Sequence, residues 1–202
     1  MFDNSLLDAD ADTGLPRRME FEYRAHVSLM KASSERPLSI ILFSFDTEKL
    51  SVDVLLGMRY GDNVKLIAET LRRETKHAYA IGRIDRVTFG VLAPFSEEQA
   101  EQYADKLRTD IKDAFINRNP ESKKTVSVGV LTLSRPGQIE SLLHDANLCV
   151  VAAKAWGRDC ICTWRQLEAK SIEQGIPLNL LTMEYKIRVD AEIMASNVAF
   201  QT

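Results

Sequence analysis

The stretch AIGRIDRVTFGVL, residues 80–92, contains two short strand-like segments on either side of a polar pair. Residues 87–89 alternate apolar and polar side chains, and Ile84 before the polar pair and Val87 and Phe89 after it are strand formers. This pattern predicts a β-hairpin whose two-residue turn is Asp85–Arg86. Such a turn needs a backbone with positive φ, which Asp85 tolerates more readily than Arg86. The remaining elements can be placed around this hairpin.

Helices and single strands alternate around the hairpin. Apolar residues at spacings of three and four predict helices over about 16–33, 53–73, 96–116 and 139–156. Apolar or alternating runs predict single strands over 39–45, 125–132 and 159–164. The fold class is therefore α/β, a sandwich with a central mixed five-stranded sheet flanked by helices.

Two helices carry clear apolar stripes. The first helix is amphipathic, with Met19, Tyr23, Val27 and Met30 on its apolar face. The helix that begins near Ser96 carries the stripe Ala100, Ala104, Leu107, Ile111 and Phe115. Each stripe is expected to face other parts of the fold, because amphipathic helices of globular proteins bury their apolar face.

The composition is that of an ordinary globular protein, with 45% hydrophobic and 27% charged residues in a chain of 202. A net charge of −3 offers no basic surface for nucleic acid. No apolar run approaches the ~20 residues of a membrane span, and no signal peptide is recognisable, so a cytoplasmic protein is expected. Cys149, Cys160 and Cys162 suggest neither a disulfide framework nor a metal site.

The first 13 residues form a polar, acidic lead-in. Asp8, Asp10 and Asp12 have the spacing of the first ligands in a calcium loop. The sixth position of that loop is Thr13 instead of glycine, and the twelfth is Met19 instead of glutamate. We therefore expect a solvated segment and no calcium site.

Six segments along the chain carry specific residues in a specific order. They are Asp10 with TGLP at 13–16, Arg18 and Phe21; SFDTEK at 44–49; Gly61–Asp62; RIDRVTF at 83–89; SVGV at 127–130; and AKAWGR at 153–158. In order and spacing they resemble the GGDEF family, the diguanylate cyclases that join two GTP molecules into cyclic di-GMP. The resemblance covers about residues 10–164 and implies the family's fold. The hairpin segment stands where the family has R-Y-G-G-D-E-F.

The resemblance implies that the metal-binding carboxylates of this family are missing here. Two divalent cations normally offset the charge that builds on the phosphates when a 3′-hydroxyl attacks. An aspartate after the first strand and an acid in the hairpin hold them, and here these positions are Ser44 and Val87–Thr88. Neither a hydroxyl nor an isopropyl group replaces a carboxylate as a ligand of hard cations. We expect no catalytic residue, metal or cofactor, although Asp46 and Asp85 leave a displaced metal site as an alternative.

Positions that the family uses for the nucleotide are partly preserved. The resemblance implies phosphate contacts for Lys49, Lys154 and Arg158 and a guanine contact for Asp62. Lys154 and Arg158 are equally explained as cations at a helix C-terminus, and Asp62 as a helix cap. Arg86 either fills the space that the phosphates use, supplies charge to a ligand there, or is a solvated turn residue.

Two other family features are missing. The region of Val52 lacks the asparagine that recognises guanine in the family. Residues 76–79 replace the family's inhibitory motif R-x-x-D, so cyclic di-GMP binding by that route is not expected.

The tail, residues 165–202, lies beyond the family's usual end. Apolar residues at spacings of three and four predict an amphipathic helix over 180–198. Its stripe is Leu180, Met183, Ile187, Ala191, Met194 and Val198. The stripe packs either on its own domain or on a second copy or partner protein.

Three segments and one leading function follow. Residues 1–13 are the lead-in, 14–164 the GGDEF-like domain and 165–202 the C-terminal helical extension. The leading expectation is a catalytically inactive regulatory domain that acts by protein contact in cyclic di-GMP signalling. The alternatives are a metal-independent sensor of a guanine nucleotide, GTP or cyclic di-GMP, and a residual cyclase with displaced metals.

Overall fold

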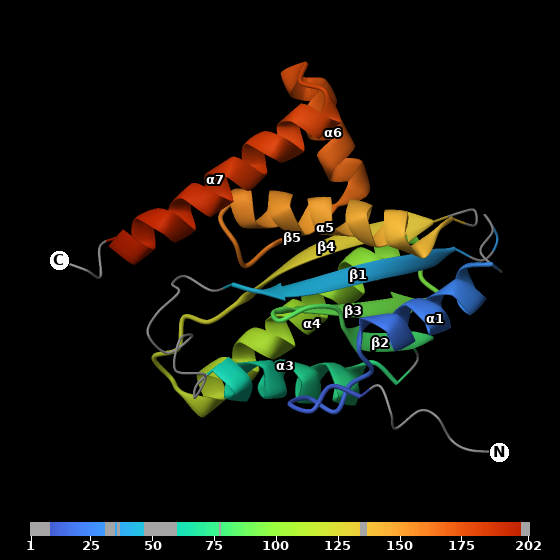
Figure 1. The fold of residues 1–202 in the computed structure, drawn as a ribbon, viewed down its shortest axis with the longest axis vertical. Helices are drawn as coiled ribbons and strands as arrows, with labels where there is room; N and C mark the ends of the chain where they lie inside the picture. The colour runs from blue at the N-terminus through green and yellow to red at the C-terminus, as the bar shows by residue number, and fades with distance from the viewer. Residues whose placement is uncertain are drawn as a thin grey trace.

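The computed structural model describes residues 9–30, 35, 37–46, 60–76, 78–133 and 137–198, with the backbone alone for residues 60 and 196–198. Figure 1 shows a central sheet with helices on both faces and two further helices at the C-terminal end. The elements are α1 (Arg18–Leu29), β1 (Leu38–Phe45), α3 (Tyr60–Glu74), β2 (Ala80–Arg83), β3 (Thr88–Ala93), α4 (Glu97–Arg118), β4 (Val126–Leu133), α5 (Ile139–Ala155), β5 (Ile161–Thr163), α6 (Trp164–Gln174) and α7 (Leu178–Val198).

The sheet has five strands in the order β2-β3-β1-β4-β5. Strand β1 is antiparallel to both of its neighbours, and β5 extends the edge parallel to β4. All eight residues of β1 are buried, because strands flank it on both sides and helices cover both faces. The predicted mixed five-stranded sheet with flanking helices is confirmed.

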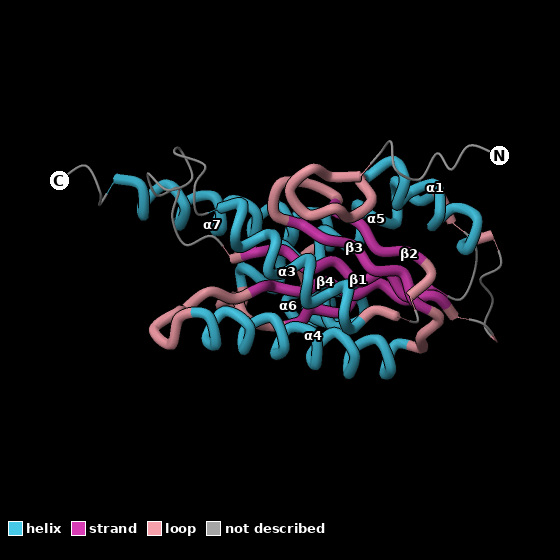
Figure 2. The backbone as a smooth tube through the Cα atoms, turned by 90° about the horizontal axis from the view of Figure 1, so that it is seen from below, coloured by secondary structure: helices cyan, strands magenta, loops and turns pink. Residues whose placement is uncertain are grey.

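The side chains of β1 alternate between two apolar cores. Ile41 and Phe43 join the core formed with α3 and α4, whereas Ile40 and Leu42 join the core formed with α1 and α5. Figure 2 shows α4 on one side of the sheet and α1 on the other. Helix α4 begins with a capping box between Ser96 and Gln99, and it buries the whole predicted stripe.

Helix α1 buries a different stripe from the one that the sequence pattern favours. Phe21, Ala25 and Leu29 are buried, while Met19, Tyr23, Val27 and Met30 are 48–76% exposed. The reason lies in the hairpin. A Cβ at Gly82 would lie 2.9 Å from the Phe21 Cβ, and a Cβ at Gly90 would lie 3.0 Å from the Phe21 Cζ. These paired glycines open the space in which the Phe21 ring packs.

The C-terminal helices fold back onto the domain. Gly175, with φ of 65°, ends α6 in the left-handed conformation, and α7 then returns along α5. Leu181, Tyr185 and Val189 are buried against α5, so the extension packs on its own domain. The predicted stripe is not the face that makes this contact, because Leu180, Met183, Ile187 and Met194 are 52–69% exposed. In the described part of the chain, no helix is both long and apolar enough to span a membrane.

Candidate functional site

The hairpin tip is held by a side chain in addition to backbone hydrogen bonds from Ile84 and Asp85 to the Thr88 carbonyl. Strand β2 ends at Arg83 and β3 begins at Thr88, so four residues connect them and the predicted two-residue turn is wrong. Asp85 Oδ1 accepts hydrogen bonds from the backbone N–H groups of Val87 and Thr88, both at 2.8 Å. An aspartate that bonds to the backbone two residues on can replace a backbone turn. Neither Asp85 nor Arg86 has a positive φ, so the tip carries no left-handed residue.

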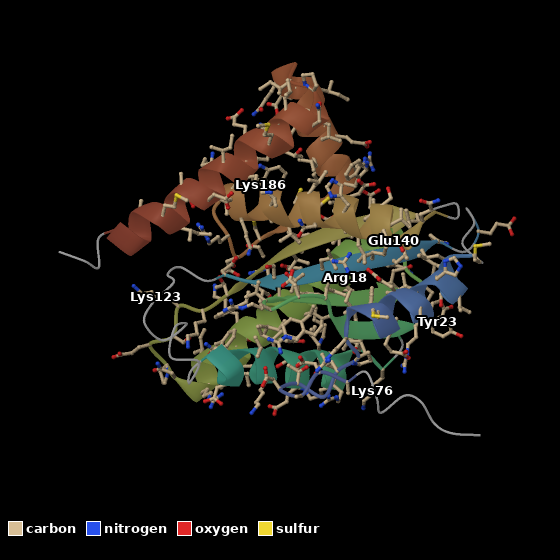
Figure 3. All side chains as sticks on the ribbon, in the orientation of Figure 1. Arg18, Tyr23, Lys76, Lys123, Glu140 and Lys186 are labelled. Carbon is tan, nitrogen blue, oxygen red and sulfur yellow. The ribbon has the colours of Figure 1, made fainter. Side chains whose placement is uncertain are left out.

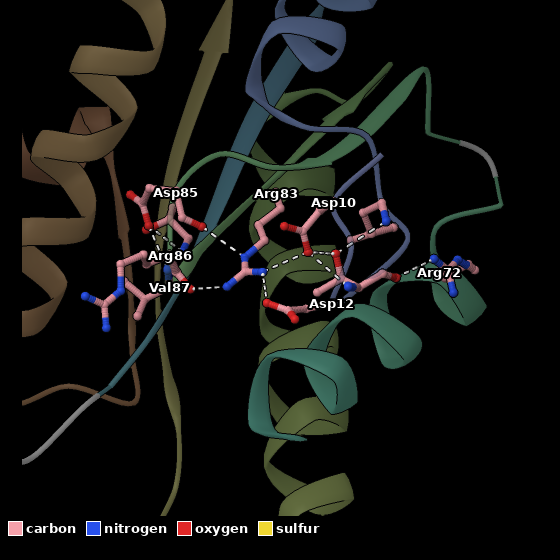
Figure 4. Close-up of polar contacts among 10 residues, drawn as sticks. Asp10, Asp12, Arg72, Arg83, Asp85, Arg86 and Val87 are labelled. Carbon is pink, nitrogen blue, oxygen red and sulfur yellow. Dashed lines mark hydrogen bonds and ion pairs between the residues drawn. The ribbon is translucent and has the colours of Figure 1, made fainter. Parts of the chain in front are cut away.

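Arg83 ties this tip to the loop before α1 (Figure 4). Its Nη1 donates to Asp10 Oδ1 at 2.8 Å and to Asp12 Oδ2 at 3.1 Å. Its Nη2 donates to the carbonyl of Arg86 at 2.9 Å, and its Nε to that of Asp85 at 3.3 Å. Burial alone would lower the pKa of Arg83, but the hydrogen bonds to Asp10 and Asp12 raise it overall. One guanidinium therefore sets the position of both segments.

The loop before α1 has further anchors. Asp10 Oδ1 accepts from the backbone N–H of Thr13 at 2.9 Å and from its hydroxyl at 2.7 Å. Arg72 on α3 donates to the Thr13 carbonyl at 2.8 Å. Partial burial would raise the pKa of Asp10, but the hydrogen bonds from Thr13 and Arg83 lower it overall. The expected solvated lead-in is therefore fixed to the fold from about Asp10 onward.

Ser44 and Thr88, two positions where the resemblance expects carboxylates, lie opposite each other on β1 and β3. The Thr88 hydroxyl donates to Ser44 Oγ at 3.3 Å. Lys154, in the last turn of α5, donates from Nζ to Ser44 Oγ at 2.9 Å and to the Phe45 carbonyl at 3.4 Å. The Val87 side chain packs against the apolar core formed with α3 and α4. The site thus places a lysine ammonium beside two hydroxyls.

Burial lowers the pKa of Lys154, while the charges of Asp46 and Asp85 oppose that effect. Within the described ranges, no group of three or more His, Cys, Asp or Glu side chains gathers in a way that could hold a metal ion. The cation that Asp46 and Asp85 stabilise here is the lysine itself.

Asp46 is buried and fully engaged by hydrogen-bond donors. Its Oδ1 accepts from the Ser127 hydroxyl at 2.7 Å, and its Oδ2 from the Thr125 hydroxyl at 2.8 Å and the Asp159 backbone N–H at 3.2 Å. It joins the end of β1 to β4 and to the turn after α5. Since Asp85 holds the hairpin tip, both acids of the alternative metal site already have structural partners.

The other predicted nucleotide contacts are dispersed. Lys49 lies outside the described residues, as does Val52. Asp62 is exposed in the first turn of α3 and forms an ion pair with Arg118 at 3.3 Å. Arg158 Nη1 donates to Glu192 Oε2 of α7 at 2.8 Å. Figure 4 shows the exposed Arg86 side chain directed away from Arg83 and Asp10.

Several of these partners could not be inferred from the sequence. Thr125, just before β4, and Ser127 in β4 donate to Asp46, and Glu192 holds Arg158 from a segment that the resemblance does not cover. Asp10 and Arg83 both lie in segments that resemble the GGDEF family. That shared resemblance was the signal in the sequence that connected the two residues.

Comparison with known proteins agrees with this fold. The family model described as "Diguanylate cyclase, GGDEF domain" matches residues 7–160. A search of curated protein sequences gave no match.

Three solved structures illustrate the similarity of fold. The chain is similar to the GGDEF domain of DgcB from Caulobacter crescentus in complex with c-di-GMP, with a TM-score of 0.68 and 16% identity over 78% of this chain and 96% of that one. It is similar to the active GGEEF domain of a diguanylate cyclase from Vibrio cholerae, with a TM-score of 0.60 and 21% identity over 75% and 99%. It is also similar to the diguanylate cyclase SiaD from Pseudomonas aeruginosa in complex with its activator SiaC, with a TM-score of 0.62 and 21% identity over 79% and 63%.

Proposed function

The chain belongs to the GGDEF family, and we propose that it is a catalytically inactive member that serves cyclic di-GMP signalling through contact with protein. One observation carries the proposal. The Lys154 ammonium is bound to Ser44, with Thr88 opposite, at the place where the family holds its divalent cations with carboxylates.

Electrostatics disfavours a metal ion at this place. A divalent cation about 4 Å from a lysine ammonium is repelled by roughly 8 kcal/mol at an effective dielectric constant of about 20. Two carboxylates would offset that repulsion, but hydroxyl groups carry no charge. The acids nearest to the ammonium, Asp46 and Asp85, already accept hydrogen bonds from protein donors. A residual cyclase with displaced metals is therefore the less favoured alternative.

Protein contact is a role open to a folded domain without this chemistry. The related fold of SiaD binds an activator protein, SiaC. Here the fold carries an added pair of helices, α6 and α7, that exposes further apolar side chains.

The first test is chemical. The purified 202-residue chain is incubated with GTP and either Mg²⁺ or Mn²⁺, and the products are separated by chromatography. We expect no cyclic di-GMP above the level without protein, while the active domain from Vibrio cholerae run in parallel forms it. Metal-dependent synthesis of cyclic di-GMP by the chain would overturn the proposal.

A metal-independent guanine-nucleotide sensor is the second candidate, and one observation favours it. The direct hydrogen-bond partners of the Lys154 ammonium are a hydroxyl and a carbonyl, both uncharged. A phosphate oxygen would supply a charged acceptor in direct contact with the ammonium. Calorimetry with GTP and with cyclic di-GMP, each with and without a chelator, tests this. Affinity that survives chelation and is lost in Lys154→Met supports the sensor, and no binding at millimolar nucleotide rejects it.

A further inference from the structure

Helix α1 leaves an apolar surface uncovered beside a hollow. Met19, Tyr23, Val27 and Met30 form the exposed stripe described above. A hollow of about 720 Å³ lies between this stripe and the start of α5. Its lining includes Tyr23, Met30 and Ile139, with Glu22 and Glu140 as acidic members. We call this surface the α1 groove.

Helix α7 leaves a second apolar surface uncovered. Leu180, Met183, Ile187 and Met194 project away from the face that packs on α5. Lys186 and Arg188, both exposed, flank Ile187 at the middle of this row. We call this surface the α7 ridge. In Figure 1, α7 extends away from α1, so the two surfaces lie at different places on one molecule.

The two surfaces are comparable in length, and each offers a charge of opposite sign that the described residues leave unpaired. The groove stripe from Met19 to Met30 is about 16 Å long and the ridge from Leu180 to Met194 about 21 Å, at 1.5 Å per residue. Within each surface some charges are already paired, Glu22 with Arg18 in the groove and Arg188 with Glu192 beside the ridge. Glu140 at the groove and Lys186 at the ridge are left to meet a partner. Among the described residues, neither Glu140 nor Lys186 forms an ion pair or is engaged elsewhere, and Figure 3 shows them on separate elements.

We propose that the α7 ridge of one copy of this chain packs into the α1 groove of a second copy. Each copy then brings both halves of the contact, and burying two uncovered stripes supplies the apolar drive for association. Lys186 of one copy faces Glu140 of the other, which sets the register. This contact gives the proposed regulatory role a surface and a partner, a second copy of the chain. Its meaning for regulation rests on the proposed function, whereas the contact itself does not.

The test is the mass of the full chain in solution, measured by light scattering and sedimentation over a wide concentration range. We expect mass above the monomer that rises with concentration. Ile187→Glu on the ridge and Tyr23→Arg in the groove each shift the chain to monomer. Ile172→Glu is the matched control, because Ile172 is 81% exposed on α6 and belongs to neither surface.

Mixing the two defective variants makes the test specific. The Tyr23→Arg chain keeps an intact ridge and the Ile187→Glu chain an intact groove, so an equimolar mixture recovers association. Lys186→Glu weakens association by roughly two- to fivefold, as for an exposed ion pair, and adding Glu140→Lys restores it.

A wild-type chain that stays monomeric overturns the contact and leaves the surfaces to a partner of another sequence. Association that the mixture fails to recover also overturns it. So does association that survives in one single variant, because ridge–ridge pairing persists in Tyr23→Arg and groove–groove pairing in Ile187→Glu. The GTP assay on the same preparation reports separately on the inactive role.

Discussion

Replacing Asp46 with asparagine distinguishes a structural carboxylate from a metal ligand. In the structure the carboxylate accepts three hydrogen bonds, from Ser127, Thr125 and the Asp159 N–H. An asparagine keeps one acceptor oxygen and places an amide N–H₂ where the other was. If the amide oxygen keeps Thr125 and Asp159, the buried Ser127 hydroxyl faces a donor and must turn its proton elsewhere.

The expected cost follows from these bonds. Hydrogen bonds to a charged group contribute about 1.5–3 kcal/mol each and neutral ones about 0.5–1.5 kcal/mol. Two weakened bonds and one reoriented hydroxyl then lower the free energy of unfolding by roughly 2–3 kcal/mol. Asp46→Ala loses all three bonds and lowers it by at least about 4.5 kcal/mol, three times the lower value for a bond to a charged group. Either loss is a large fraction of the stability of an average domain, about 5–15 kcal/mol.

Urea unfolding followed by circular dichroism measures this loss. Asp113→Asn, an exposed acid on α4, is the control and should leave the unfolding midpoint unchanged. The wild-type midpoint should also be the same with Mn²⁺ and with a chelator. The reasoning is refuted if Asp46→Asn is as stable as the wild type, or if Mn²⁺ stabilises the wild type and not the variant.

Three further changes test other parts of the structure. Phe21→Ala should lower the free energy of unfolding by about 3–5 kcal/mol in the same assay, because the ring is buried over the paired hairpin glycines. Arg83→Met should cost about 1–2 kcal/mol at neutral pH. Part of this loss depends on the charge of Asp10, whose pKa is lowered in the folded protein. That part is fully present above pH 3.8, the ordinary pKa of the unfolded chain, and disappears as the pH falls through the lowered pKa of the folded state. Urea titrations of both proteins at neutral and acidic pH measure it. Ser44→Asp combined with Thr88→Glu restores two carboxylates, so calorimetry should detect Mn²⁺ binding that the wild-type chain lacks.

The sequence pattern predicted the sheet well because its strands are buried on both faces. Residues 39–45 and 125–132 are short, mainly apolar runs between helices. A buried strand explains such a run better than a helix or a loop does. The stripe of α4 was also predictable, because Ala100 to Phe115 is the helix's one continuous apolar row.

The helices α1 and α7 show where periodicity fails. Each carries two apolar rows at helical spacing, and a pattern does not say which row meets the core. In α1 the choice depends on Gly82 and Gly90, about 60–70 positions along the chain, because only their missing side chains make room for Phe21. The hairpin turn failed for a local reason, since the two hydrogen bonds accepted by the Asp85 side chain replace the strained backbone that a two-residue turn requires.

The tail and the candidate site are joined by one contact that neither the pattern nor the resemblance contains. Arg158 has a left-handed backbone, with φ of 63°, just after α5, and its guanidinium is held by Glu192 of α7. Burial is the main cause that lowers the pKa of Lys154, and the charge of Arg158 adds to that effect. A protein that packs on the exposed ridge of α7 therefore lies on the same helix that holds Arg158. This arrangement gives the proposed contact a direct physical route to the site, through the position of a single arginine.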